Sequence, residues 1–464
     1  MMITAPVFLF AFLPFSVLFY VLFGKNRKKL CLGIVCAVYH VLFNMHDPIN
    51  ILWLPLLIAF SYFAARAVSG KKKVIAVALG AIPVLWLVIM RALEHSRYFE
   101  FVYPIGITLP ALCAAAYVWD VAYGDEPELN IGNLALYLGF FPIMLVGPFV
   151  GYSGFKRLSD SDNMEVTLSR CSSGIGMLAL GFIKRIAVGA VLIDGYSRIF
   201  EYSWDAPNLA IIVLLVVLIY FGSFFSISGY YDMAVGLSRI YGLDLHAVSA
   251  NPLAVATVGE YSASLFGSVR EWSRKYILTP LEMTTGKSMS GLIGIAVTCV
   301  CVMVFLRTSL DMLLLAIPLI AFAYASVRLG VDGTQKKSRH GVRALWGLLT
   351  VLVVGVMWIF ITMSGRAPID ISSITFENAE YQTDIVLMTF SGLKYLFVVI
   401  LAIACLVPGS KIAGRIYSRL GRRACAVVDY GSMLMLLVMF VFAVMFFLPQ
   451  FEIYDTKPFV YIVV

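Results

Sequence analysis

The chain has 464 residues, of which 61% are hydrophobic and only 13% are charged, and its mean hydropathy is +0.90. This composition excludes a soluble globular protein and is typical of a polytopic membrane protein. The formal net charge of +8 does not indicate a nucleic-acid-binding protein, because the basic residues cluster in short loops between apolar segments, where membrane topology accounts for them. We therefore expect one all-α integral-membrane domain over residues 1–464.

Apolar segments recur along the chain at lengths near the roughly 20 residues that a membrane span needs. They lie at residues 3–23, 30–45, 51–68, 74–93, 101–123, 134–150, 174–199, 209–228, 291–306, 310–327, 345–363, 385–407 and 431–448. Because some are short, the pattern predicts about eleven to thirteen hydrophobic segments. The first is expected to be an uncleaved span, because its basic cluster follows the apolar run and no small-residue cleavage site is evident.

The basic loops predict the orientation of the spans in the plasma membrane. The loop at 24–29 and the lysines at 71–73 are basic and are separated by two spans, so both should face the cytoplasm. The alternation of basic residues 336–343, acidic residues 370–384 and basic residues 411–423 predicts three final crossings. Both termini are then outside and the number of crossings is even. Segment 134–150, interrupted by two prolines, is the candidate that does not cross.

A polar stretch at residues 228–281 separates two sets of apolar segments. Polar, irregular backbone is not viable against lipid, so it must be buried in protein or line a water-filled cavity. We expect short, broken helices around a polar cavity; a cytoplasmic loop with an amphipathic surface helix is the alternative. The residues proposed to line the cavity are Asp232, Glu260, Arg270, Trp272 and Arg307. Asp232 and Glu260 are expected to satisfy backbone groups or basic neighbours, and Trp272 to pack.

Four sequence blocks follow one another in order between about residues 100 and 310. They are PIGIT with a following Y..DV..G at 104–124, N……Y..FFP….GP at 130–148, SGYYDMAVGL at 228–237, and a segment at 252–281 that contains Glu260, Trp272, Arg274, Tyr276 and Pro280-Leu281. Together they resemble the membrane-bound O-acyltransferase (MBOAT) family. The branch that they resemble contains the bacterial proteins of alginate O-acetylation and teichoic-acid D-alanylation.

The chain departs from the family pattern at both signature histidines. The family segment E-F-W-R-R-W-H aligns with EYSASLF at 260–266, so that Phe266 occupies the first histidine position. The second histidine, in a GLWHG turn, aligns with Arg307. The resemblance implies that this second histidine is the catalytic base, in a channel that joins the acyl donor to the acceptor. Arginine cannot take this role, because its guanidinium stays protonated and has no acceptor lone pair.

None of the five histidines stands at a family position, and no catalytic residue is assigned. His246 is the nearest to the polar stretch; it is either a substitute base or a solvated or capping residue. Arg307 is followed four residues later by Asp311, so the two can pair on one helix face. The pair either lies at an interfacial turn, or places a fixed positive charge in the channel that would hold an anionic head group.

The resemblance implies acyl transfer across the membrane to an exported cell-envelope polymer or exopolysaccharide, as in polysaccharide O-acetylation. It also implies an acyl donor of the acyl-carrier or acyl-CoA thioester type, with an acyl carrier protein and an extracytoplasmic acyl-transfer protein as partners. The replaced histidines leave open an alternative, a catalytically degenerate relative that serves as a membrane scaffold or as a lipid- or partner-binding protein. No metal-ligand spacing or nucleotide fingerprint is present, and the eight cysteines are mostly in apolar segments, so no bound cofactor or metal is expected.

Overall fold

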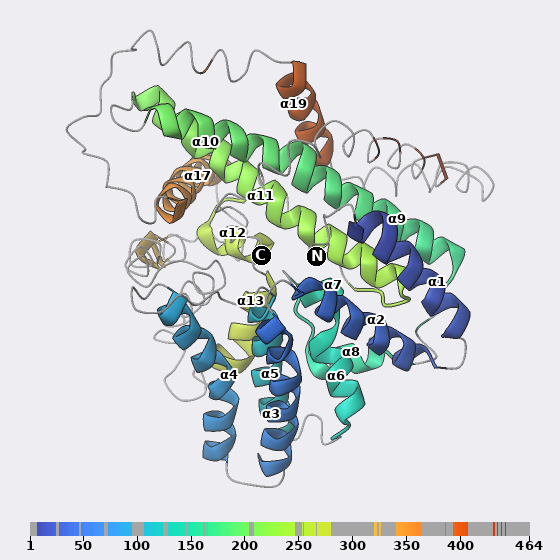
Figure 1. Cartoon of the computed structure of the whole chain (residues 1–464). Helices are drawn as coiled ribbons and strands as arrows, with labels where there is room; N and C mark the ends of the chain where they lie inside the picture. Colours follow the sequence, from blue (N-terminus) through green and yellow to red (C-terminus); the bar gives the residue numbers. More distant parts are fainter. Residues whose placement is uncertain are drawn as a thin grey trace.

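The computed structural model describes residues 7–24, 27–45, 48–68, 73–94, 106–123, 129–144, 147–160, 164, 166–203, 208–245, 253, 255–265, 267–279, 320–322, 324–325, 340–362, 386, 393–406, 430–431, 434, 438 and 441. Helices are the only elements of regular structure in these ranges (Figure 1). Four are long and apolar enough to cross a membrane: Pro48–Val68, Ser169–Glu201, Leu209–Ile240 and Gly341–Phe360. The predicted all-α polytopic membrane fold is therefore confirmed, whereas the orientation of the termini stays a prediction.

Two long helical rods pack against each other along one side of the molecule (Figure 1). The first is continuous through α9 (Leu168–Phe182), the π-helical segment η3 (Ile183–Ala190) and α10 (Val191–Ser203), and the second is α11 (Leu209–Ile240). Glycines let the backbones meet: a Cβ added to Gly229 would lie 2.6 Å from the Gly181 carbonyl oxygen. Such small-residue contacts are typical of membrane helix pairs.

The α11 helix is longer than its apolar sequence predicts. The apolar run was expected to end at 228, but the helix continues to Ile240 and most of residues 228–240 are buried. The first thirteen residues of the stretch 228–281 thus continue α11, and the short, broken helices expected within it follow after residue 240. The reason is that Asp232, the only acidic residue there, has an ion-pair partner inside the fold, and the glycines in this part serve helix contacts instead of ending the helix.

The N-terminal half contributes a second group of helices: η1 (Phe8–Phe12), α1 (Leu13–Phe23), α2 (Lys28–Phe43), η2 (Pro48–Ile51), α3 (Trp53–Val68), α4 (Lys73–Glu94) and α5 (Thr108–Ala122). The centre of this group is α5, in which every residue from 109 to 121 is buried. Figure 1 shows α3, α4 and α5 side by side. Burial on all faces requires a partner for the one acidic side chain of α5, Asp120.

The segment predicted not to cross the membrane is broken into short pieces. They are α6 (Ile131–Gly139), α7 (Phe141–Met144) and, further on, α8 (Tyr152–Leu158). Nine residues of helix span only about 14 Å, against roughly 30 Å for the hydrocarbon core. Asn130 caps α6, its side chain accepting from the backbone N–H groups of Gly132 and Asn133, and Gly147 has a positive φ of 117° before a cis bond to Pro148.

The second part of the polar stretch forms the short helices that were expected. They are α12 (Val258–Leu265), α13 (Gly267–Ser273) and the π-helical turn η5 (Arg274–Leu278). Two longer helices follow, α17 (His340–Thr362) and α19 (Leu393–Leu406). Two buried hydrogen bonds join α17 to α12 and to the residues just before it, from the Trp358 indole to the Tyr261 hydroxyl at 3.0 Å and from the Thr350 hydroxyl to the Ala256 carbonyl at 3.0 Å.

Candidate functional site

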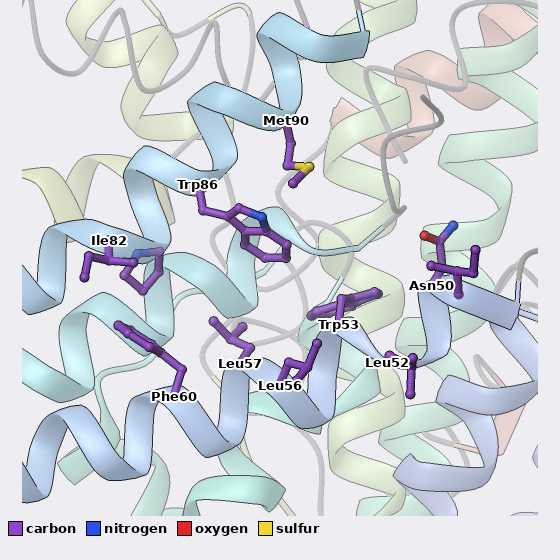
Figure 2. Close-up of a pocket in the computed structure, with 11 residues that line it drawn as sticks. Asn50, Leu52, Trp53, Leu56, Leu57, Phe60, Ile82, Trp86 and Met90 are labelled. Atoms are coloured by element: carbon purple, nitrogen blue, oxygen red, sulfur yellow. The ribbon is translucent and has the colours of Figure 1, made fainter. Parts of the chain in front are cut away.

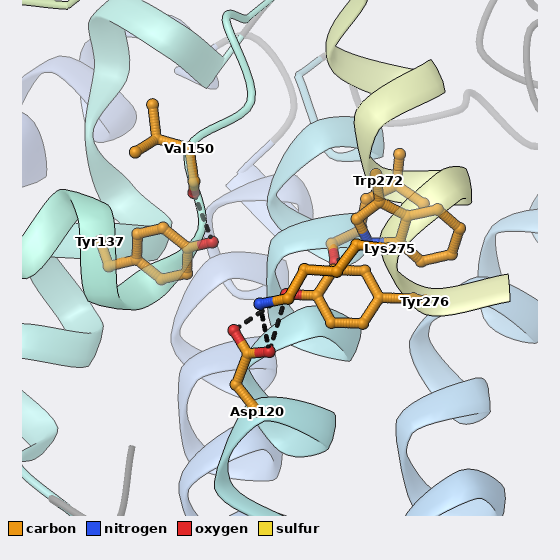
Figure 3. A network of polar contacts seen from close by, with 7 residues as sticks. Asp120, Tyr137, Val150, Trp272, Lys275 and Tyr276 are labelled. Carbon is orange, nitrogen blue, oxygen red and sulfur yellow. Dashed lines mark hydrogen bonds and ion pairs between the residues drawn. The ribbon is translucent and has the colours of Figure 1, made fainter. Parts of the chain in front are cut away.

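A buried carboxylate, Asp120 on α5, joins the first sequence block to the last. Its side chain is 3% exposed and accepts a hydrogen bond from the Lys275 Nζ at 2.8 Å and from the Tyr276 hydroxyl, which lies 2.9 Å from both carboxylate oxygens. Figure 3 shows the lysine and the tyrosine converging on the carboxylate from one side. A buried charge is tolerated only when its partners are close and well oriented. This cluster therefore fixes η5 against α5.

Aromatic rings surround the same contact. The ring centroids of Trp119, Trp272 and Tyr276 lie 5.5–5.8 Å from one another, a spacing favourable for aromatic pairs. Trp272 is 1% exposed, and its indole N–H donates to the Leu112 carbonyl at 2.8 Å. Tyr137, drawn in the same view, donates to the Val150 carbonyl at 2.9 Å and so joins α6 to the residues after Pro148. Trp272 thus packs as a wall residue and satisfies its one polar atom.

A second buried ion pair lies between the two long helical rods. The Nζ of Lys184 is 2.6 Å from the Asp232 carboxylate, and the two side chains are 16% and 9% exposed. Lys184 lies in the π-helical segment η3, and such insertions in long helices are frequent at functional sites. The next residue, Arg185, is buried with its guanidinium 5.4 Å from the centre of the Tyr230 ring. This part of the membrane region is therefore polar inside a largely apolar bundle.

Glu260 connects the start of α12 to α17. One carboxylate oxygen accepts from the Ala256 backbone N–H at 2.7 Å, and the other accepts from Arg343 at 2.9 Å. The backbone N–H of Glu260 in turn donates to the Thr257 hydroxyl at 3.1 Å, an arrangement close to a capping box. Arg270, on the following helix, donates to the Gly259 carbonyl at 3.2 Å.

The residues proposed to line one cavity thus contact different neighbours. Asp232 forms an ion pair with Lys184 in η3, Glu260 contacts α17, and Trp272 contacts α5. Arg270 donates to the carbonyl of Gly259, so Arg270 and Glu260 are the two proposed residues that the structure brings near each other. Phe266 and Arg307 lie outside the described residues, as does His246. The shared polar cavity stays a prediction.

Two cations central to these contacts, Lys184 and Lys275, were not selected from the sequence. Lys184 had a usable signal: it stands with Arg185 inside the apolar run 174–199, and an ionisable residue within a span needs a partner. Lys275 had none beyond its place in a charged stretch, because its partner lies 155 residues away.

His40 is the histidine whose side chain the structure describes. It is buried on α2, with its Nε2 3.0 Å from the Ile51 carbonyl and its Nδ1 3.3 Å from the Asn44 amide nitrogen. Because a carbonyl only accepts, Nε2 carries the hydrogen and donates it, and Nδ1 accepts from the amide. Both ring nitrogens are therefore engaged, and His40 has no lone pair left for a substrate proton. Within the described residues no group of three His, Cys, Asp or Glu side chains is arranged to hold a metal ion.

The chain is similar to bacterial enzymes that acetylate polysaccharides. It is 26% identical over 294 residues to the probable alginate O-acetylase of Pseudomonas fluorescens, covering 61% of this chain and 57% of that protein. The corresponding protein of Pseudomonas aeruginosa is 24% identical, with 62% and 58% covered. The peptidoglycan O-acetyltransferase of Helicobacter pylori is 22% identical, with 61% and 62% covered. No family model matches the chain.

The matched region spans less than two thirds of the length of each of these relatives. The loss of the family histidines at Phe266 and Arg307 stays a prediction. Over about 60% of its length, however, the chain is similar to O-acetylating enzymes of two different polysaccharides, which confirms the resemblance to the membrane-bound O-acyltransferases that its four sequence blocks predicted.

Proposed function

We propose that this protein is a membrane-bound O-acyltransferase that transfers an acetyl or other short acyl group to an exported cell-envelope polysaccharide. The observation that carries the proposal is the similarity to both alginate and peptidoglycan O-acetylating proteins. The names of these relatives both describe the transfer of an acetyl group to an oxygen of a polysaccharide. The similarity does not favour the alternative of a scaffold without activity.

The reaction class requires a thioester or comparable donor, an acceptor hydroxyl, and a base for the hydroxyl proton. The donor is proposed to arrive on an acyl carrier or as an acyl-CoA type thioester, and an extracytoplasmic partner to complete delivery to the polymer. Two of the buried carboxylates, Asp120 and Asp232, hold helices in place in this scheme, because each is already paired with a lysine. Arg307, if it stands in the channel, would bind a negatively charged group and would not take a proton.

The proposal is tested in the cells that carry the gene. Base-labile acetate would be measured on each exported polysaccharide, by mass spectrometry, in cells with the gene, in cells without it, and in cells complemented with the wild-type chain. We expect one polysaccharide to lack its ester groups in cells without the gene and to regain them on complementation. Unchanged ester content in every exported polymer would contradict the proposal and return the scaffold alternative to first place.

A matching experiment uses the purified protein in phospholipid nanodiscs. Radiolabelled acetyl-CoA or an acetylated carrier is supplied with alginate or peptidoglycan fragments, and base-labile label on the glycan is counted. Label on one acceptor but not the other would identify the acceptor class. Because a protein partner is part of the proposal, a negative result with the purified chain alone is repeated with membranes and periplasm from the gene's own cells, and a second negative result counts against the proposal.

A further inference from the structure

An apolar groove of about 430 Å³ lies between the start of α3 and the second half of α4, and none of the ion-paired residues described above lines it (Figure 2). Its volume is within the range of small-molecule sites, roughly 300–1,000 Å³. Of the eleven residues that line it, Asn50 is the one with a polar side-chain amide, and the others are aliphatic, aromatic, proline or methionine. Figure 2 shows Asn50 at one end of the groove and Phe60 and Ile82 at the other.

The rim and the floor of the groove differ in exposure. The rim residues Leu52, Leu56 and Ile82 are 58%, 66% and 42% exposed, whereas the floor residues Trp53 and Leu57 are 4% and 5% exposed. Both walls belong to apolar helices, since 48–68 is long and apolar enough to span a membrane and 75–90 is a shorter apolar helix. The groove therefore opens to the hydrocarbon of the bilayer, where a hydrocarbon chain fills it at no cost in desolvation.

The floor of the groove is built before any ligand arrives. The ring of His40 meets the Trp53 ring edge-on at 5.2 Å, and its Nε2–H donates to the carbonyl of Ile51, beside Asn50. Pro83, inside α4, lines the opposite wall and removes one helix hydrogen bond there. A site whose walls are already fixed loses little further freedom on binding, which favours one ordered chain over passing lipid.

We propose that this groove binds one acyl chain of a membrane phospholipid, with the glycerol ester of that lipid at the Asn50 amide. The apolar walls match the chain, and the single amide lies at the first turn of the span, where a membrane helix meets the interface and where ester carbonyls are found. The amide N–H donates to the ester, which sets the direction of the chain along the groove toward Phe60 and Ile82. This inference does not depend on the proposed acyl transfer.

The test uses the full-length protein in detergent, stripped of lipid and titrated with dioleoyl phosphatidylglycerol, with binding read by native mass spectrometry. A phosphatidylglycerol with a photoactivatable diazirine at the end of one acyl chain then maps the contact by peptide sequencing. We expect one saturable lipid per protein, with cross-links to α3 and α4 near Phe60 and Ile82. Excess unlabelled phospholipid should remove those cross-links.

Two matched variants separate the groove from ordinary lipid contact. Leu56→Trp places an indole in the groove from its exposed rim, whereas Leu85→Trp makes the same change on an α4 residue that is 57% exposed and does not line the groove. We expect at least a fivefold loss of the saturable binding in the first and none in the second. Asn50→Leu should weaken phospholipid binding by roughly threefold to tenfold, the value of one hydrogen bond.

Several results would overturn the proposal. They are cross-links spread over all exposed apolar helices without saturation, wild-type binding by a folded Leu56→Trp protein, or a native mass spectrum in which protein dimers exclude the lipid. If Leu56→Trp does not fold, as judged by gel filtration and thermal unfolding, Ile82→Trp blocks the groove from the opposite wall and is held to the same expectation.

Discussion

The Lys184–Asp232 ion pair offers the sharpest test of how this fold is held together. Replacing Asp232 with Asn keeps the shape of the side chain but leaves the Lys184 ammonium, 16% exposed, without the carboxylate that lies 2.6 Å from it. Removing one partner of a buried pair typically costs about 3–5 kcal/mol. The cost of a lone lysine at the centre of a membrane helix is of the same order, about 2.5–3.5 kcal/mol on insertion scales. We therefore expect Asp232→Asn to destabilise the protein by roughly 3–5 kcal/mol.

The double variant Lys184→Met/Asp232→Leu decides whether charge is the cause. It removes both ions and fills their volume with apolar atoms, and such replacements are often neutral or stabilising. We expect it to lie within about 1 kcal/mol of the wild type. The control is Lys29→Met, which breaks an ion pair between Lys29 and Asp160 whose side chains are 29% and 52% exposed, and which should cost less than about 1 kcal/mol.

The assay is equilibrium unfolding in mixed SDS micelles, followed by tryptophan fluorescence. If Asp232→Asn costs no more than Lys29→Met, the pair is not buried in the way described. If the double variant is as unstable as the single one, shape and not charge holds the two rods together at this point.

Three further predictions use the same assay or an activity measurement. Gly229→Ala should destabilise by about 1–3 kcal/mol through overpacking, because the added Cβ would lie 2.6 Å from the Gly181 carbonyl; an unfolding midpoint equal to that of the wild type would show that the rods are further apart. Asp120→Asn should cost only roughly 1–2 kcal/mol, because the Lys275 side chain is 47% exposed and can turn to water; a loss as large as that of Asp232→Asn would contradict this. Arg307→Ala should lose binding of an anionic ligand or partner but leave any acyl transfer unchanged, because an arginine cannot serve as the base; abolished transfer in a folded protein would refute that reasoning.

Part of the candidate site was accessible from the sequence because its signal is local. Charge and glycine within an apolar chain marked residues 228–281, and the short helices α12 and α13 with Glu260 and Arg270 occur there. The same local signal did not indicate that residues 228–240 continue the long helix α11. A carboxylate in an apolar run looks like an interruption until its partner is known, and the partner of Asp232 stands 48 residues earlier.

Hydropathy, proline positions and motif spacing are properties of neighbouring residues, so the membrane class, the all-α fold, the broken segment around 140–148 and the similarity to O-acyltransferases could be predicted without a structure. The tertiary structure was needed to show which charges neutralise each other, that Asp120 meets Lys275 and Tyr276, and that Trp53 and Trp86 line one groove. Such pairings depend on which helices pack together. That choice is made by close backbone contacts such as Gly181 with Gly229, whose two members are 48 residues apart and carry no local mark of their partner.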